Sequence, residues 1–226
     1  GVTGCLGVLD SESEAGAGEG DETTPTDGGE WRVSYGFEDP ELPAWTVEDD
    51  RWQRTTALAY EGSGSATVDT FSNVSVLATV TPDTMSEGAR IGRFSTGWLE
   101  TSASYGGGVA LTNSDGQLEL FVGSNNPQWT VLTDTEEPTF TEVEGAQGYD
   151  RWVRTEATFD WAAGSVEVTF TDSETGASGT ERVELGEGTD VQTIVLRGFT
   201  SEEVERGNGI QTDRCEMFWD DIVVTG

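Results

Sequence analysis

The chain has 226 residues, with 43 acids against 11 bases, and its formal net charge is −32. Every base is arginine, because the sequence contains neither lysine nor histidine. Nucleic-acid binding needs clustered basic side chains, and a Ser-His-Asp or Cys-His catalytic centre needs histidine, so we expect neither. No apolar run reaches the ~20 residues that a membrane-spanning helix requires.

The acidic surface predicts an adaptation to salt. A charge of this size destabilises a compact state through self-repulsion, but salt near ~1 M shortens the screening length to roughly 3 Å. A surface saturated with acids and free of lysine resembles that of haloarchaeal proteins. The alternative is an acidic protein from an ordinary habitat.

Residues 1–30 are predicted to form a flexible acidic tether. Val2-Thr3-Gly4-Cys5 resembles a lipobox, and the stretch that follows is too poor in apolar residues to fold. The resemblance implies a lipoprotein anchored through Cys5 to the outer face of the cytoplasmic membrane or the cell envelope, and a chain that begins inside its leader. The alternatives are an incidental thiol on a disordered segment and a disulfide between Cys5 and Cys215.

Residues 31–226 are predicted to form one all-β domain. Helical spacing of apolar residues is lacking, whereas alternation with a period of two is frequent. The turn at 113–116, Asn-Ser-Asp-Gly, predicts a tight hairpin. Strands are expected at 74–80, 117–122, 165–170, 181–185 and 191–196. Strand number and spacing indicate an antiparallel β-sandwich of two sheets.

Four segments, in this order, resemble concanavalin-like and laminin-G-like jelly rolls. They are YGFEDPELPAW, GGGVALTNSDGQLELFVGSNNPQWTVLT, RWVRTEATFDWAAGSVEVTFTDSETG and FWDDIVVTG. The resemblance implies a two-sheet sandwich with a concave face, usually a carbohydrate-binding or adhesion module and sometimes an enzyme.

The last strand carries a candidate calcium site. Alternation places Phe218 and Asp220 on the same face as Ile222, the expected core face, so Asp220 needs a cation, an arginine or several backbone N–H groups. In the resembled family, an aspartate here and a glutamate on the first strand often hold a structural calcium. This resemblance implies one Ca²⁺ at Asp220 and Glu38, with Asp39 and Asp221 as second choices for its ligands. The alternative is that Asp220 caps a turn or pairs with arginine.

Five residues are candidates for sugar binding, which needs exposed aromatic faces and polar groups beside them. Trp219 is predicted to face the concavity, because it is out of phase with Ile222. The alternative for each tryptophan is a place in the core or at a sheet edge. The candidates are Trp98, Tyr105, Asn125, Trp129 and Trp219.

Two single residues complete the set of candidate sites. Asn73-Val-Ser75 is an N-glycosylation sequon, which on an exported protein is a candidate for a glycan. Cys215 begins a predicted strand, where a small buried thiol is the simplest interpretation.

The sequence favours a non-catalytic, surface-anchored module that binds extracellular or envelope polysaccharide. The Glu-x-Asp-x-x-Glu run of laminarinase-like relatives is absent, and lyases of this shape use His and Tyr with basic residues, often Lys. One alternative is a structural cell-surface protein that contacts other proteins. A second is a glycoside hydrolase with two carboxyl groups brought together from separate strands.

Overall fold

The protein is described here from a computed structural model. It describes residues 31–42, 44–47, 52–69, 78–82, 90–101, 105–125, 128–133, 141–143, 150–186, 191–200 and 216–226. Cys5, Asn73, Cys215 and the whole of residues 1–30 lie outside the described residues. Tyr105 and Asn125 belong to described strands, but their side chains lie outside the description.

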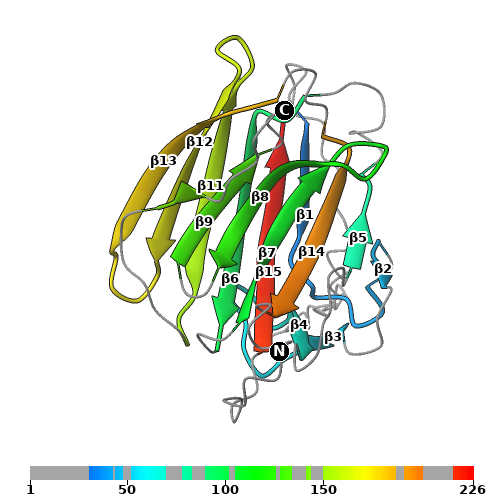
Figure 1. The fold of residues 1–226 in the computed structure, drawn as a ribbon. Helices are drawn as coiled ribbons and strands as arrows, with labels where there is room; N and C mark the ends of the chain where they lie inside the picture. The colour runs from blue at the N-terminus through cyan, green and yellow to red at the C-terminus, as the bar shows by residue number, and fades with distance from the viewer. Residues whose placement is uncertain are drawn as a thin grey trace, which may run out of the picture.

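The described residues form two antiparallel β-sheets packed face to face, as Figure 1 shows, and the predicted all-β sandwich is confirmed. The first sheet, called sheet A, has the strand order β13-β12-β11-β6-β15-β4-β3, with β1 added beside β15. Its strands are β1 (Arg32–Tyr35), β3 (Trp52–Thr55), β4 (Ser65–Asp69), β6 (Arg93–Glu100), β11 (Val153–Asp160), β12 (Ser165–Asp172), β13 (Ser178–Glu184) and β15 (Glu216–Thr225).

The second sheet, called sheet B, has the order β10-β9-β8-β7-β14-β5-β2. Its strands are β2 (Thr46–Val47), β5 (Ala78–Val80), β7 (Tyr105–Thr112), β8 (Leu118–Asn125), β9 (Gln128–Thr133), β10 (Thr141–Glu142) and β14 (Thr193–Thr200). The predicted hairpin at Asn113 joins β7 to β8: Asn113 accepts the Gly116 N–H, and Gly116 has a φ of 76°. Only a residue that tolerates positive φ fits there, which explains the glycine.

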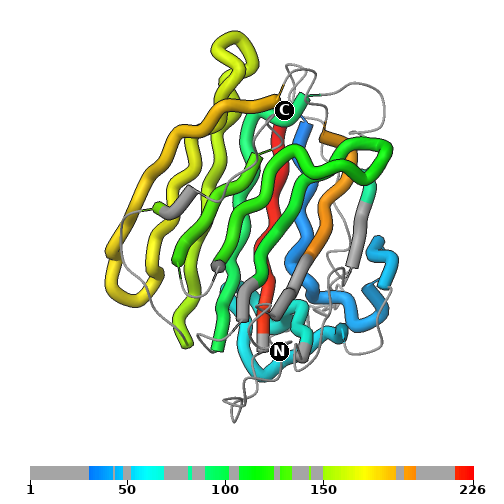
Figure 2. Tube along the Cα trace, viewed as in Figure 1, coloured from blue at the N-terminus to red at the C-terminus, as the bar shows by residue number. Residues whose placement is uncertain are grey.

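The two ends of the described chain are paired. β1 lies antiparallel to the second half of β15, with Tyr35 opposite Ile222 and Arg32 opposite Thr225. Beyond them, Trp31 and Gly226 exchange two backbone hydrogen bonds. Figure 2 shows this pairing as the blue segment beside the red one.

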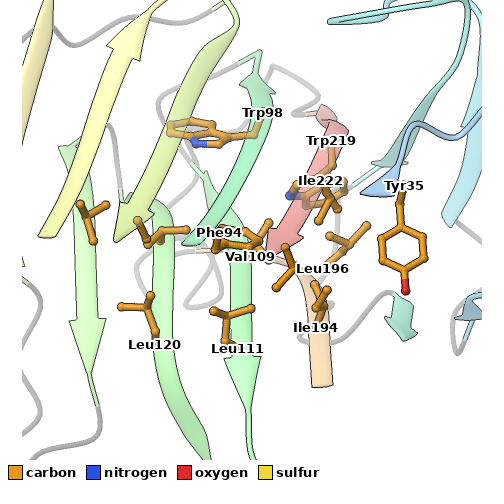
Figure 3. Packing of buried hydrophobic residues seen from close by; sticks show 14 of the residues in the cluster. Tyr35, Phe94, Trp98, Val109, Leu111, Leu120, Ile194, Leu196, Trp219 and Ile222 are labelled. Atoms are coloured by element: carbon orange, nitrogen blue, oxygen red, sulfur yellow. The ribbon is translucent and has the colours of Figure 1, made fainter. Parts of the chain in front are cut away.

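A single large core fills the space between the sheets. Phe94, Trp98 and Trp219 from sheet A pack against residues such as Val109 and Leu120 from sheet B (Figure 3). Burial of apolar surface on this scale is the main force that holds the sheets together. Among the described residues there is no helix long and apolar enough to cross a membrane.

A buried carboxyl group lies at one end of this interior. Glu100 follows Trp98 on the inward face of β6, and Ser124 follows Val122 on the inward face of β8. Burial raises the pKa of the Glu100 carboxyl to about 8, and the adjacent Ser124 hydroxyl lowers the pKa by less. Within the part of the chain that the structure describes, neither the Ser124 hydroxyl nor the Oε1 atom of Glu100 has a hydrogen-bond partner of normal geometry.

A β-bulge reverses the side-chain phase of the last strand. The register of β15 against β6 shifts between Asp220 and Val223, and Asp221 has a φ of 44°. Two residues therefore occupy the place of one, which moves the later side chains to the other face. Trp219 and Ile222 consequently both face the core. The prediction that Asp220 shares a face with Ile222 is wrong for this reason.

Candidate carbohydrate-binding groove on sheet A

The outer face of sheet A carries a groove that crosses four adjacent strands. Its volume is about 390 Å³, and it lies over β15, β6, β11 and β12. Seven of its ten lining residues are polar, because alternation in each strand sends most apolar side chains inward and polar side chains outward. The lining residues are Arg93, Phe94, Ser95, Glu156, Ala157, Thr158, Glu167, Thr169, Val223 and Thr225.

Strand register arranges these side chains in two rows across the sheet. The first row runs from Thr225 through Arg93 and Thr158 to Glu167. The second row runs from Val223 through Ser95 and Glu156 to Thr169. Glu156 and Glu167 are therefore diagonal neighbours on adjacent strands, a relationship that places Cα atoms about 7–8 Å apart.

Three charged side chains in the groove are available to a ligand. Arg93, Glu156 and Glu167 are exposed, and none of them forms an ion pair or a side-chain hydrogen bond with another described residue. The neighbouring arginines, by contrast, are engaged. Arg154 binds the Asp221 carboxylate and the Ser95 hydroxyl, and Arg182 binds the Ser165 hydroxyl and Asp160.

Two aromatic rings flank one side of the groove. The ring of Tyr60 covers Gly97, two residues beyond Ser95 on the same face of β6; a Cβ at Gly97 would lie 2.7 Å from the ring. Trp152 packs edge-on against Tyr60 at 5.7 Å between centroids, and Arg154 lies 5.8 Å from the Tyr60 ring centre. Both rings are only half-buried, so aromatic surface remains beside the polar rows.

Asp220 holds the loop that carries Tyr60. Its Oδ2 atom accepts the backbone N–H groups of Tyr60 and Glu61 at 2.8 and 2.9 Å, and its Oδ1 atom accepts the N–H of Asp221. Burial raises the pKa of this carboxyl to about 6, against the opposing effect of these three N–H donors. The sequence required Asp220 to meet a cation, an arginine or several N–H groups, and the structure supplies the N–H groups.

Glu38 binds the same loop a few residues further on. It accepts the N–H groups of Ser63 and Gly64 at 2.9 and 3.2 Å, and the Ser63 hydroxyl at 2.6 Å. The Ser63 hydroxyl is the main reason that the pKa of Glu38 lies below its usual value. Glu38 and Asp220 thus fasten the segment from Tyr60 to Gly64 to the sandwich.

The surroundings of the four acids predicted to bind calcium do not fit that cation. Calcium needs six to eight oxygen ligands, whereas Glu38 and Asp220 face hydrogen-bond donors. Asp39 accepts the N–H of Glu41, and Asp221 pairs with Arg154. No group of three or more acidic or cysteine side chains suited to a metal occurs among the described residues.

Three of the tryptophans predicted to bind sugar are core residues. Trp98, Trp129 and Trp219 are at most 2% exposed, so their rings are not available for stacking on a ligand. The indole N–H of Trp98 binds Thr155, and the Trp129 ring stacks on Phe170 of the opposite sheet. Their assignment to the binding face is therefore wrong. The predictions for the side chains of Tyr105 and Asn125 fall outside the described residues.

The groove residues were not among the candidates named from the sequence, although the local alternation of polar residues in β11 points to part of the groove. In β11, every second residue from Arg154 to Asp160 is polar, and these positions form the solvent face, as the alternation of the sequence indicates. Which strands flank β11 is a matter of topology, so its pairing with β6 and β12 could not be predicted. The contact between Tyr60 and Trp152 likewise joins residues distant in sequence.

Comparison with known proteins identifies the fold. No family model matches the chain, and no curated protein matches its sequence. Among solved structures, it is similar to the CBM2 module of an evolved Dit protein of Lactobacillus casei BL23 phage J-1, with a TM-score of 0.53, 13% identity, and 87% and 95% of the two chains covered. An endo-β-1,4-glucuronan lyase of the fungus Trichoderma reesei also has a TM-score of 0.53, with 7% identity and coverage of 80% and 89%.

Lectin I of Ulex europaeus, solved with the methyl glycoside of α-L-fucose, gives a TM-score of 0.50 at 7% identity, with 86% and 98% of the chains covered. The protein has the concanavalin-like jelly-roll fold. At these identities the likeness establishes the fold, and the activity has to be argued from the chain's own residues.

Proposed function

We propose that the protein is a non-catalytic carbohydrate-binding module whose groove on sheet A holds a polysaccharide. The observation that carries this proposal is the groove itself, with hydroxyl groups and three exposed charged side chains that form no ion pair with another described residue. Carboxylates accept hydrogen bonds from sugar hydroxyls, and a guanidinium donates them. The half-buried rings of Tyr60 and Trp152 add the apolar surface on which a sugar face can stack. Neighbours of the fold that bind sugars support the same proposal.

A glycan array followed by calorimetry on the hits tests the proposal. We expect binding to at least one polysaccharide, weakened about fivefold for each of Glu156→Gln and Glu167→Gln, since a hydrogen bond to a charged group contributes at least about 1 kcal/mol. The matched control is Glu41→Gln with Glu174→Gln, which removes two exposed carboxylates outside the groove lining. Binding that the control weakens as much as the groove variants would contradict the proposal.

Glycan cleavage is the second candidate, because Glu156 and Glu167 lie on adjacent strands of one groove. Hydrolysis of a glycosidic bond uses two carboxyl groups on either side of the scissile bond. We place it second because both side chains are exposed and no contact with a described residue holds either in place. New reducing ends released by the wild type, and not by Glu156→Gln, would establish the enzyme.

We further propose that the module is tethered to a membrane by lipid on Cys5 and works in concentrated salt. The support is the lipobox-like stretch at Val2–Cys5 and the net charge of −32. Detergent-phase partition of the chain made in an exporting archaeal host, compared with Cys5→Ser, tests the anchor. Partition that is equal for the two chains would refute it.

A further inference from the structure

The groove is electrically asymmetric along its length. Its strands are spaced by about 4.8 Å, so β15, β6, β11 and β12 cover about 14 Å across the sheet. The guanidinium of Arg93 is on β6, whereas the carboxylates of Glu156 and Glu167 are on β11 and β12, and none of the three has an ion-pair partner in the described part of the chain. A ligand that crosses the strands from β15 therefore meets a cation on the second strand and an anion on each of the third and fourth strands.

Among the described residues, the two arginines nearest to the anionic end are bound to other groups. Arg182 stands opposite Glu167 in the register of β13, but its guanidinium binds Ser165 and Asp160 instead. Arg154 lies two residues before Glu156 on the same face, yet it is held by Asp221 and Ser95. Neither glutamate is therefore paired with a cation of the described residues.

We infer that the groove selects a glycan bearing a protonated primary amine, such as a glucosamine-containing chain, with the amine between Glu156 and Glu167. This inference rests on the proposed carbohydrate-binding function. It is supported by the groove itself and by the charged side chains along it, of which Arg93, Glu156 and Glu167 form no ion pair with a described residue, whereas Arg154 and Arg182 do. A uronate in the same place would meet two carboxylates, with only Arg93 in its favour.

Four oligosaccharides of equal length test the inference by calorimetry, at the lowest salt concentration that keeps the protein folded. They are fully deacetylated chito-oligosaccharide, its N-acetylated form, a gluco-oligosaccharide and a glucuronan oligosaccharide. The first two differ only in the amine. We expect the deacetylated ligand to bind about 5- to 10-fold more tightly than the acetylated one, as one partly exposed ion pair allows, and the uronate to bind most weakly.

The variants locate the selectivity. Glu156→Gln with Glu167→Gln should make the deacetylated and acetylated ligands bind equally, whereas Arg93→Gln and the Glu41→Gln, Glu174→Gln control should keep the preference. Thermal melts confirm that each variant is folded. Salt near ~1 M should reduce the preference, because it screens exposed charges.

The outcomes separate the inference from the function on which it rests. Equal affinity for the deacetylated and acetylated ligands in the wild type, or tighter binding of the uronate, overturns the inference and leaves sugar binding standing. If none of the four oligosaccharides binds and the glycan array shows no binding either, the proposed carbohydrate-binding function is itself overturned. A preference that persists in the double glutamate variant places the amine elsewhere and also overturns the inference.

Discussion

The indole N–H of Trp219, on the last strand of sheet A, donates a hydrogen bond across the interior to the carbonyl oxygen of Gly108 in sheet B, at 3.1 Å. This bond joins the two layers at their centre, between residues 111 positions apart in the sequence. The bulge at Asp221 allows Ile222 to face the core together with Trp219. Because both partners are buried, neither has water as a substitute.

Trp219→Phe should destabilise the fold by about 2–3 kcal/mol. The change removes the donor, leaves the Gly108 carbonyl without this partner, and opens a small void in a close-packed interior. Urea unfolding at fixed salt concentration measures the difference in the free energy of unfolding. Trp152→Phe is the control, since the Trp152 ring is only half-buried. An equal loss in the control would mean that the interior bond contributes nothing.

Gly108→Ala should prevent folding or reduce stability by more than about 3 kcal/mol. A Cβ at this position would lie 2.1 Å from the backbone oxygen of Val122 and 2.7 Å from the Cα of Gly123. Backbone atoms of a paired strand cannot move aside as a side chain can, so the sheet itself would be displaced. Circular dichroism and unfolding curves measure the effect. Gly36→Ala is the matched control, because its Cβ would meet no atom closer than 4.0 Å.

Stability should fall between about pH 4.5 and pH 8 through the titration of Glu100. Burial raises the pKa of Glu100 from 4.5 to about 8, so in this range the folded state binds a proton that the unfolded state has released. The favourable contribution is complete below pH 4.5, is lost as the pH rises through 8, and changes no further above that.

Glu100→Gln should therefore be more stable than the wild type above pH 8, by on the order of a few kcal/mol, with little difference near pH 4.5. Unfolding curves across this pH range give the comparison. Glu174→Gln, at an exposed position, serves as the control. Parallel pH profiles for wild type and Glu100→Gln would show that the interior carboxyl does not carry the effect.

Gly97→Ala should weaken ligand binding without unfolding the protein. Its Cβ would lie 2.7 Å from the Tyr60 ring, so the ring has to move while the backbone N–H of Tyr60 stays bound to Asp220. Displacing Tyr60 also disturbs its contacts with Trp152 and Arg154 beside the groove. Affinity for the array hit, measured with a thermal melt on the same sample, tests this. Unchanged affinity would show that Tyr60 takes no part in recognition.

The architecture could be predicted from the sequence because strand alternation is a local signal. The expected strand at 165–170 falls within β12, the one at 117–122 begins one residue before β8, and the hairpin at Asn113 joins β7 to β8. The alternation of β15 predicted the wrong face for Asp220 because a bulge inserts one extra residue into the strand. Nothing in the sequence Asp220-Asp221 marks that bulge. The roles of Trp98 and Trp129 depended on which sheet faces which, and this is decided by contacts between distant segments.

For the candidate groove, too, the sequence predicts the local pattern of a strand but not which strands lie side by side. The alternation of the sequence predicts the polar face of β11. That Arg93, Glu156 and Glu167 lie close together depends instead on β6, β11 and β12 being neighbours in the sheet, which is a matter of topology. Asp220 was correctly expected to need compensation for its charge. The identity of its partners, Tyr60 and Glu61, could not be found without the fold, because 160 and 159 residues separate them from it.

The pairing of β1 with the end of β15 also determines how the domain would respond to tension. A pull on the chain ahead of Trp31, with the body held through sheet A, acts first on the two bonds that Trp31 exchanges with Gly226. Because β1 and β15 are antiparallel, the backbone hydrogen bonds between Arg32–Tyr35 and β15 would then break one after another, so they would not share the load. A pulled molecule should thus give way at this edge at low force, while the strands that form the groove stay intact.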